Sequence, residues 1–278
     1  MNVQPGFIYD LKIVSSSPQG YWLGDNQNQV WMPKSYAPAI LKTDNTVSVF
    51  VFHGHDLQLT ATPKKPYVML NDFGCLRVKS IEKSGYFLDW GIERDLFLPA
   101  AESLAPYKVN DYVLIYLLID SFSNRLMASA KINKFIDLKP NLTTGDEALV
   151  LVGNASPLGY EVIANKRFKG IIYHSQVFKP VVPGTLIKAW VMKVREDGLI
   201  DFSLRMPGFS EIQMAADKIE DVLVQNYGFL ELNDSSDPQL IYNTLEMSKK
   251  VFKKAVGVLY KQHKIIFEGN GIRLIGED

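Results

Sequence analysis

The sequence is poor in cysteine and histidine, with one cysteine (Cys75) and four histidines among 278 residues. A single cysteine excludes an internal disulfide framework, and histidines and cysteine without paired spacing do not predict a zinc site. No apolar run approaches the roughly 20 residues that span a bilayer. The N-terminus lacks the basic start and apolar core of a secretion signal. These absences predict a cytoplasmic protein, bacterial in type, with no membrane partner and no cofactor.

Net charge is also lacking, because 30 lysines and arginines balance 30 aspartates and glutamates. A strongly basic nucleic-acid protein is therefore excluded, and any such affinity must come from local patches and stacking. The charge is uneven along the chain. Residues 138–207 hold nine basic and six acidic side chains, whereas residues 208–278 hold eight and eleven.

Catalytic motifs are missing as well. The chain has no Walker loop, no Gly-x-Ser-x-Gly elbow and no His-Glu-x-x-His sequence. Asp89, Glu93 and Asp95 are close together but have no further partner cluster, so they are interpreted as turn and surface groups. Cys75 begins an expected strand and is interpreted as a small buried hydrophobe. The sequence predicts a protein that is not an enzyme.

What the chain does contain is a repeated Gly-Tyr pair, at Gly20, Gly85 and Gly159. The spacings of 65 and 74 residues are too long for a solenoid and fit a small β-domain used three times. Each copy offers five short alternating segments, and Pro63-Lys64-Lys65-Pro66 is a natural boundary after the first. The expected β-domains are residues 1–66, 67–137 and 138–207.

The pattern becomes helical after Pro207-Gly208, where a fourth domain over 208–278 is expected. Apolar residues at helical spacing predict helices over 210–225, 238–245 and 249–262. Asp237-Pro238 is a helix-start signal, and Ser248 is expected to cap the last helix. Gly269-Asn270-Gly271 predicts a hairpin within 264–275. Three helices and a hairpin indicate a winged helix, with 249–262 in the recognition position.

The β-repeats resemble the S1 domains of ribosomal protein S1 and its relatives. Ser84-Gly85-Tyr86-Phe87-Leu88 matches the Phe-Gly-Ala-Phe-Val second strand of that family, and Asp95–Pro99 weakly matches its third. Asp120 with Arg125–Ser129 matches the basic opening of the last strand. The expected fold is mainly β: three tandem S1-like OB-type five-stranded barrels followed by an α+β winged-helix domain.

A wider resemblance covers essentially the whole chain. Residues 81–99, 132–135, 195–198 and 247–255 together are similar to the conserved virulence factor B family of bacteria. The resemblance implies tandem S1 domains, a winged helix, RNA binding and an effect on gene expression.

Strand alternation separates structural from binding aromatics. The residue after each glycine is always tyrosine (Tyr21, Tyr86, Tyr160) and is expected to face the core. The next position varies and is expected to face outward, which makes Trp22 and Phe87 stacking platforms. Tyr173 is the candidate in the third copy. The family's aromatic before glycine is replaced by Gln19, Ser84 and Leu158, and its histidine by Met32, Leu98 and Tyr173.

Basic candidates for phosphate contacts fall in three places. Arg125 matches the family's basic position. Lys166, Arg167 and Lys169 form a basic loop in the third copy, and Lys249, Lys250, Lys253 and Lys254 cluster on the expected recognition helix. Each set also fits a solvated surface.

The resulting hypothesis is a non-catalytic protein whose partner is single-stranded RNA, bound by stacking and basic contacts that weaken with salt. The winged helix could add other nucleic acid. Two alternatives stay open: a protein-interaction scaffold with degenerate S1 barrels, and a winged-helix regulator that binds duplex DNA.

Overall fold

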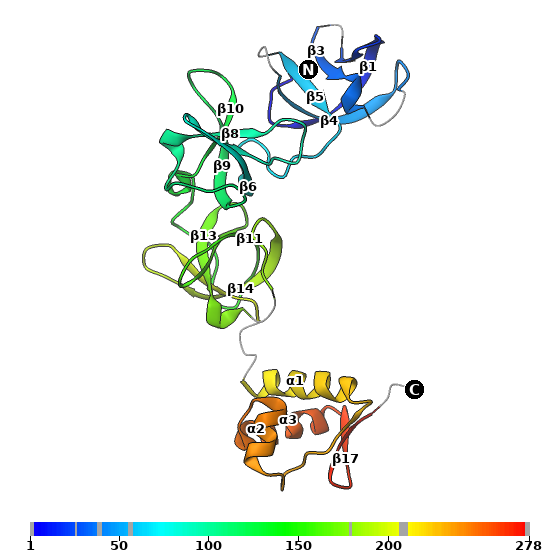
Figure 1. Cartoon of the computed structure of the whole chain (residues 1–278), viewed down its shortest axis with the longest axis vertical. Helices are drawn as coiled ribbons and strands as arrows, with labels where there is room; N and C mark the ends of the chain where they lie inside the picture. The colour runs from blue at the N-terminus through cyan, green and yellow to red at the C-terminus, as the bar shows by residue number, and fades with distance from the viewer. Residues whose placement is uncertain are drawn as a thin grey trace. The chain divides into compact units, whose positions relative to one another are not determined.

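The computed structural model describes residues 3–25, 27–37, 41–54, 58–177, 180–205 and 211–275. The chain divides into two compact units, Met1–Arg205 and Met206–Asp278. The first unit contains three five-stranded β-structures and the second contains helices and a small sheet (Figure 1). The expected change of character at Pro207-Gly208 lies outside the described residues. Among the described residues, no helix has the length and apolar character needed to cross a bilayer.

The first β-structure is a closed barrel with strand order β1-β2-β3-β5-β4, in which β3 and β5 pair in parallel. Its inward-facing side chains form a buried cluster that includes Ile13, Leu23, Met32 and Val51. Its strands are β1 (Ile8–Ser16), β2 (Gly20–Gly24), β3 (Gln29–Pro33), β4 (Thr46–His53) and β5 (Leu59–Thr62).

The second β-structure is a five-stranded sheet with order β10-β9-β6-β7-β8, curled so that β8 and β10 lie side by side. The third is a closed barrel that repeats the order of the first. The strands of the second are β6 (Phe73–Glu82), β7 (Gly85–Leu88), β8 (Leu96–Pro99), β9 (Tyr112–Ile119) and β10 (Leu126–Ser129). Those of the third are β11 (Glu147–Ala155), β12 (Gly159–Ala164), β13 (Phe168–Tyr173), β14 (Leu186–Val194) and β15 (Ile200–Ser203).

The repeated glycine has a steric cause. It opens the second strand of each barrel, where that strand runs against the third. A Cβ on Gly85 would lie 2.3 Å from the Leu98 carbonyl oxygen, and one on Gly159 would lie 2.1 Å from that of Ile172. Only glycine permits this approach, so the pair marks the same hairpin in each copy. The first strand of each barrel also shifts register against the second at the same place, as a β-bulge does.

The second unit is a winged helix. Its elements are α1 (Glu211–Gln225), β16 (Phe229–Leu230), α2 (Pro238–Leu245), α3 (Lys249–Lys261), β17 (Ile265–Glu268) and β18 (Gly271–Leu274). Asp237 caps α2, and the Ser248 hydroxyl accepts from the Val251 amide to cap α3, as the sequence predicts. Strand β16, which pairs with β18, has too short an apolar signal to be predicted. The mainly β fold with three S1-like barrels and a winged helix is confirmed.

Neighbouring barrels share apolar cores. Phe50 and Phe52 of the first barrel are 1% and 2% exposed and belong to the buried cluster of the second. The second and third barrels meet through a cluster that includes Phe73, Leu114 and Ile163. The Pro63–Pro66 segment therefore joins two barrels that are packed together.

Candidate nucleic-acid interface

The outward face of the second barrel carries an aromatic pair. Phe87 on β7 lies opposite Phe97 on β8, with ring centroids 5.3 Å apart. Both rings are half-buried, whereas their neighbours Leu88 and Leu98 are fully buried. Strand alternation thus places Phe87 on the outer face, as the sequence predicts, and supplies a partner that the sequence analysis did not select. The two rings form a continuous apolar surface that a base can cover.

The first barrel repeats this arrangement with tryptophans. Trp22 on β2 lies opposite Trp31 on β3, with ring centroids 5.1 Å apart. Trp31 is in turn the neighbour of Thr60 on β5. The hairpin register signals such cross-strand partners, because the residue opposite an outward aromatic must also face outward.

The inward tyrosines are only partly as expected. Tyr21 is 4% exposed and lies in the first core, and Tyr86 packs against the second core. Tyr160 corrects the expectation. It is only half-buried and lies outside the third core cluster, and its ring packs edge-on against His174, with ring centroids 5.6 Å apart.

The third barrel has no aromatic pair at the equivalent place. Glu161 on β12 lies opposite Ile171 on β13, and Ile171 neighbours Asp201 on β15. Tyr173 lies further along β13, where its hydroxyl accepts from Arg195 Nη2 at 2.6 Å. Arg195 Nε also donates to Asp201 at 2.8 Å, and that carboxylate raises the pKa of the guanidinium. Tyr173 is therefore held in a polar network.

The basic loop of the third barrel is engaged in ion pairs. Lys166 pairs with Asp72, and Arg167 pairs with Asp137 at 2.6 Å. Lys169 pairs with Glu161 at 3.0 Å and is largely covered. These carboxylates neutralise much of the charge that the sequence offers to phosphates.

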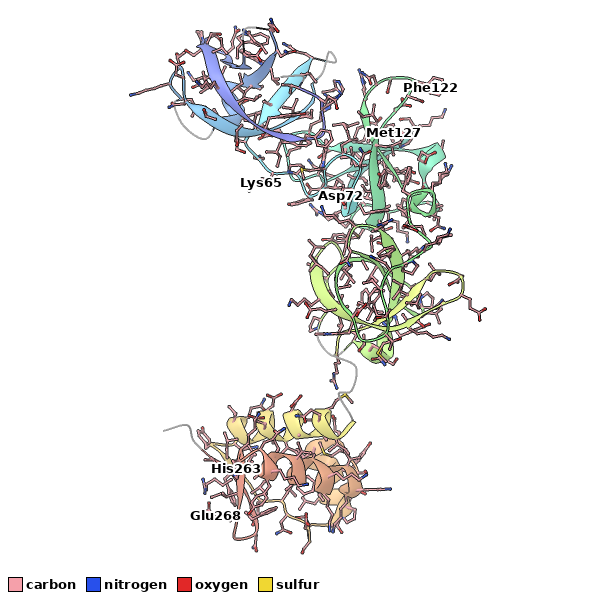
Figure 2. The ribbon with its side chains drawn as sticks, turned by 180° about the vertical axis from the view of Figure 1, so that it is seen from behind. Lys65, Asp72, Phe122, Met127, His263 and Glu268 are labelled. Carbon is pink, nitrogen blue, oxygen red and sulfur yellow. The ribbon has the colours of Figure 1, made fainter. Side chains whose placement is uncertain are left out.

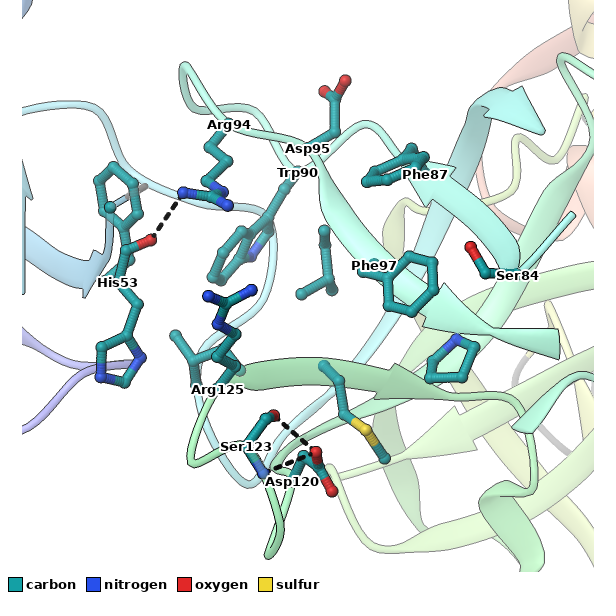
Figure 3. Close-up of a pocket in the computed structure, with 16 residues that line it drawn as sticks. His53, Ser84, Phe87, Trp90, Arg94, Asp95, Phe97, Asp120, Ser123 and Arg125 are labelled. Atoms are coloured by element: carbon teal, nitrogen blue, oxygen red, sulfur yellow. Dashed lines mark hydrogen bonds between the residues drawn. The ribbon is translucent and has the colours of Figure 1, made fainter. Parts of the chain in front are cut away.

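One hollow of about 410 Å³ is lined by two arginines, Arg125 and Arg94 (Figure 3). The sequence analysis selected Arg125 but missed Arg94. Arg125 is exposed and directly precedes β10, and Met127 of that strand lines the same hollow as Phe97. Arg94 comes from the loop between β7 and β8, where no strand or helix period signals its direction. Its Nη1 donates to the His53 carbonyl oxygen at 3.3 Å. Burial, with the charges of Arg125 and Arg94, lowers the pKa of His53.

A loop at the edge of this hollow carries an uncovered ring. Phe122, between β9 and β10, is 98% exposed and stands at the tip of its loop (Figure 2). The Asp120 carboxylate accepts from the Phe122 and Ser123 amides and from the Ser123 hydroxyl, which fixes the loop. Hydrogen bonding of this kind lowers the pKa of Asp120.

The four predicted lysines of α3 differ in their surroundings. Lys249 is half-buried, and its Nζ donates to the Ser236 carbonyl oxygen at 2.8 Å, so it supports the loop before α2. Lys253 lies 3.8 Å from Asp234. Lys250 and Lys254 are exposed and make no ion pair with any described residue. The buried face of α3 holds Phe252, Ala255, Val256 and Leu259, as the helical period predicts.

Known proteins share both types of domain. Residues 5–64 match the model of the S1 domain, and residues 217–274 match that of the CvfB-like winged helix domain. The chain carries an S1 domain and a CvfB-like winged helix domain.

Bacterial relatives match this chain over nearly its whole length. The chain is 27% identical to the uncharacterized protein YitL of Bacillus subtilis, over 97% of this chain and 93% of the relative. It is 26% identical to conserved virulence factor B of Staphylococcus haemolyticus, over 94% and 91% of the two chains. A solved multidomain protein with nucleic acid binding domains from Streptococcus pneumoniae is 24% identical, covers 96% of this chain and 97% of its own, and has a TM-score of 0.43. The resemblance to the virulence factor B proteins thus extends over nearly the whole chain.

Proposed function

We propose that the chain is a non-catalytic protein that binds single-stranded RNA through the first two barrels. The observation that carries the proposal is the pair of outward aromatic surfaces, Trp22–Trp31 and Phe87–Phe97. Aromatic rings on an OB-type barrel stack bases at about 1–3 kcal/mol each, without base preference. Arg125 lines the same hollow as Phe87 and Phe97, and in this proposal its guanidinium binds a phosphate of the strand.

The matched domains support this function. S1 and winged-helix families are binding modules, and the match to the S1 model covers the barrel that holds Trp22 and Trp31. Lys250 and Lys254 add free positive charge on the CvfB-like winged helix. Lys166, Arg167 and Lys169 contribute less, because their ion pairs must break first. The resemblance to the virulence factor B proteins further supports a role in regulating gene expression after transcription.

The test is a titration of fluorescent single-stranded RNA, single-stranded DNA and duplex DNA at two salt concentrations. We expect salt-sensitive binding to single-stranded RNA. Phe87→Ala should weaken it about 5- to 150-fold, the range that corresponds to the loss of one stacked base. The matched control is Ile171→Ala, at the position of the third barrel that is equivalent to Phe97. Equal affinity of wild type and a folded Phe87→Ala variant would contradict the assignment.

A second candidate function applies to the third barrel alone. Leu149, Leu158 and Leu186 are between 48% and 67% exposed there. Glu161 and Ile171 stand where the second barrel has Phe87 and Phe97. These features favour contact with a protein. If the wild-type chain binds no nucleic acid, the result would support the hypothesis of a protein-interaction scaffold. A preference for duplex DNA would support the hypothesis of a DNA-binding winged helix.

A further inference from the structure

Two hollows adjoin where the first and second barrels meet. One has a volume of about 410 Å³ and opens onto Phe97 and Arg125. The other has a volume of about 490 Å³ and opens onto Trp31 and Thr60. They share five lining residues, so we call them together the junction groove. The shared residues are Phe52, Gly54, Phe87, Arg94 and Asp95.

The two sides of the groove are fixed to one another. The Phe50 ring from the first barrel packs edge-on against Trp90 of the second, with centroids 5.3 Å apart. Within the second barrel, Trp90 Nε1 donates to the Val68 carbonyl oxygen at 2.8 Å, which holds the ring in place. Between the barrels, the Leu70 amide donates to the Gly6 carbonyl oxygen at 3.0 Å. A groove held by a shared core does not need to be ordered when a ligand binds, which lowers the entropic cost of binding.

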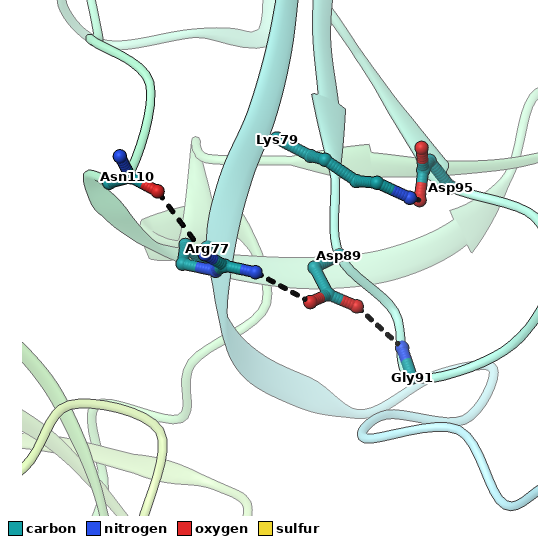
Figure 4. Close-up of polar contacts among 6 residues, drawn as sticks. All are labelled: Arg77, Lys79, Asp89, Gly91, Asp95 and Asn110. Carbon is teal, nitrogen blue, oxygen red and sulfur yellow. Dashed lines mark hydrogen bonds and ion pairs between the residues drawn. The ribbon is translucent and has the colours of Figure 1, made fainter.

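Positive charge remains at the centre of the groove. Arg94 makes no ion pair with any described carboxylate, since its neighbours are already paired. Asp95 pairs with Lys79 at 2.9 Å (Figure 4), and Glu93 pairs with Lys64 at 3.2 Å. The guanidinium of Arg94 donates one N–H group to the His53 carbonyl oxygen. Its remaining N–H donors suit a phosphate, because the planar guanidinium can donate to two phosphate oxygens at once.

We propose that a single RNA strand lies along the junction groove and crosses both barrels. One base covers Trp31, the next part of the backbone places a phosphate on Arg94, and a further base covers Phe87 and Phe97. This path rests on the proposed function and deepens it, because two weak sites joined by one strand bind it far more tightly than either alone.

The test compares a strand of about 4 nucleotides, the smallest site of one OB-type barrel, with a strand of about 12 nucleotides, which is long enough for two such sites. We expect the longer strand to bind wild type at least about tenfold more tightly. Trp31→Ala and Arg94→Gln should each remove about tenfold from the affinity for the longer strand, and change that for the shorter strand less than about twofold. The matched control is Arg77→Gln, which removes an arginine of the same barrel that lies outside the groove and pairs with Asp89 and Asn110 (Figure 4).

The outcomes separate the path from the function. If Phe87→Ala weakens binding but Arg94→Gln and Trp31→Ala do not, the path is overturned and the proposed function stands. If wild type binds no single-stranded RNA, both are overturned. Arg94→Gln decides the matter even if Trp31→Ala unfolds the first barrel, because Arg94 lies in a loop and its replacement leaves both aromatic pairs intact. Circular dichroism checks the folding of each variant.

Discussion

The second and third barrels share strand order, a bulged first strand and the glycine that brings two strands together, yet their outer faces differ in chemistry. The second presents Phe87 and Phe97, whereas the third presents Glu161 and Ile171 at the same register. Inward positions are constrained by packing in both barrels, but outward positions are free to change. The comparison teaches that membership in the S1 fold does not by itself provide a stacking surface.

The candidate phosphate-binding residues of the second and third barrels also differ in their ion pairs. Arg94 and Arg125 make no ion pair with any described residue, whereas the third barrel's Lys166 and Arg167 pair with Asp72 and Asp137. The third barrel uses its positive charge to hold the second barrel and the connecting segment. Burial at that contact also raises the pKa of the Cys75 thiol to about 12, so the thiol stays protonated at neutral pH.

Introducing an aromatic pair into the third barrel would remove the difference in stacking surface between the second and third barrels. In Glu161→Phe combined with Ile171→Phe, we expect affinity for single-stranded RNA to rise about 5- to 150-fold, since one stacked base is worth about 1–3 kcal/mol. A fluorescence titration measures this change. Glu161→Gln controls for the lost charge, and Leu149→Phe controls for an aromatic ring outside the Glu161–Ile171 pair of positions. An increase of the same size with Leu149→Phe would show that any exposed ring suffices.

Neutralising the free lysines of α3 would extend the comparison to the CvfB-like winged helix. Lys250→Gln with Lys254→Gln should reduce the slope of log affinity against log salt by about 1.4, because each phosphate contact on a single strand contributes about 0.7. Titrations at several salt concentrations give this slope. The control is Lys218→Gln with Lys264→Gln, since those lysines already pair with Glu246 and Glu220. An unchanged slope in the first variant would remove α3 from the interface.

The smallest expected effect concerns His53 at the edge of the junction groove. Burial lowers its pKa in the folded state, with a further contribution from Arg125 and Arg94. Between the lowered pKa of folded His53 and the ordinary value of about 6.5, the unfolded chain therefore binds a proton that the folded chain does not. The free energy of unfolding should fall as the pH drops from 7 towards 5, and less so in His53→Gln. Urea unfolding at several pH values measures this, and parallel curves for the two proteins would refute it.

Much of the fold could be predicted from the sequence because local signals agree. The helix α2 spans Pro238–Leu245 as expected, since Asp237 and Pro238 fix its start. Of the binding candidates, Phe87 and Trp22 lie on outer faces, which strand alternation alone predicts. Their role in binding RNA stays a prediction.

The sequence by itself determined the repeated barrels, the winged helix and the outward direction of Trp22 and Phe87, because these depend on period, turn chemistry and the close strand contact at glycine. Only the tertiary structure decided which charges stay free. Lys166 and Asp72 are far apart in the sequence yet form an ion pair. Arg94 pairs with no carboxylate of the described residues, although Asp95 is its neighbour in the chain, because Asp95 pairs with Lys79. Long-range packing sets such pairings, since it depends on how whole barrels meet and not on local pattern.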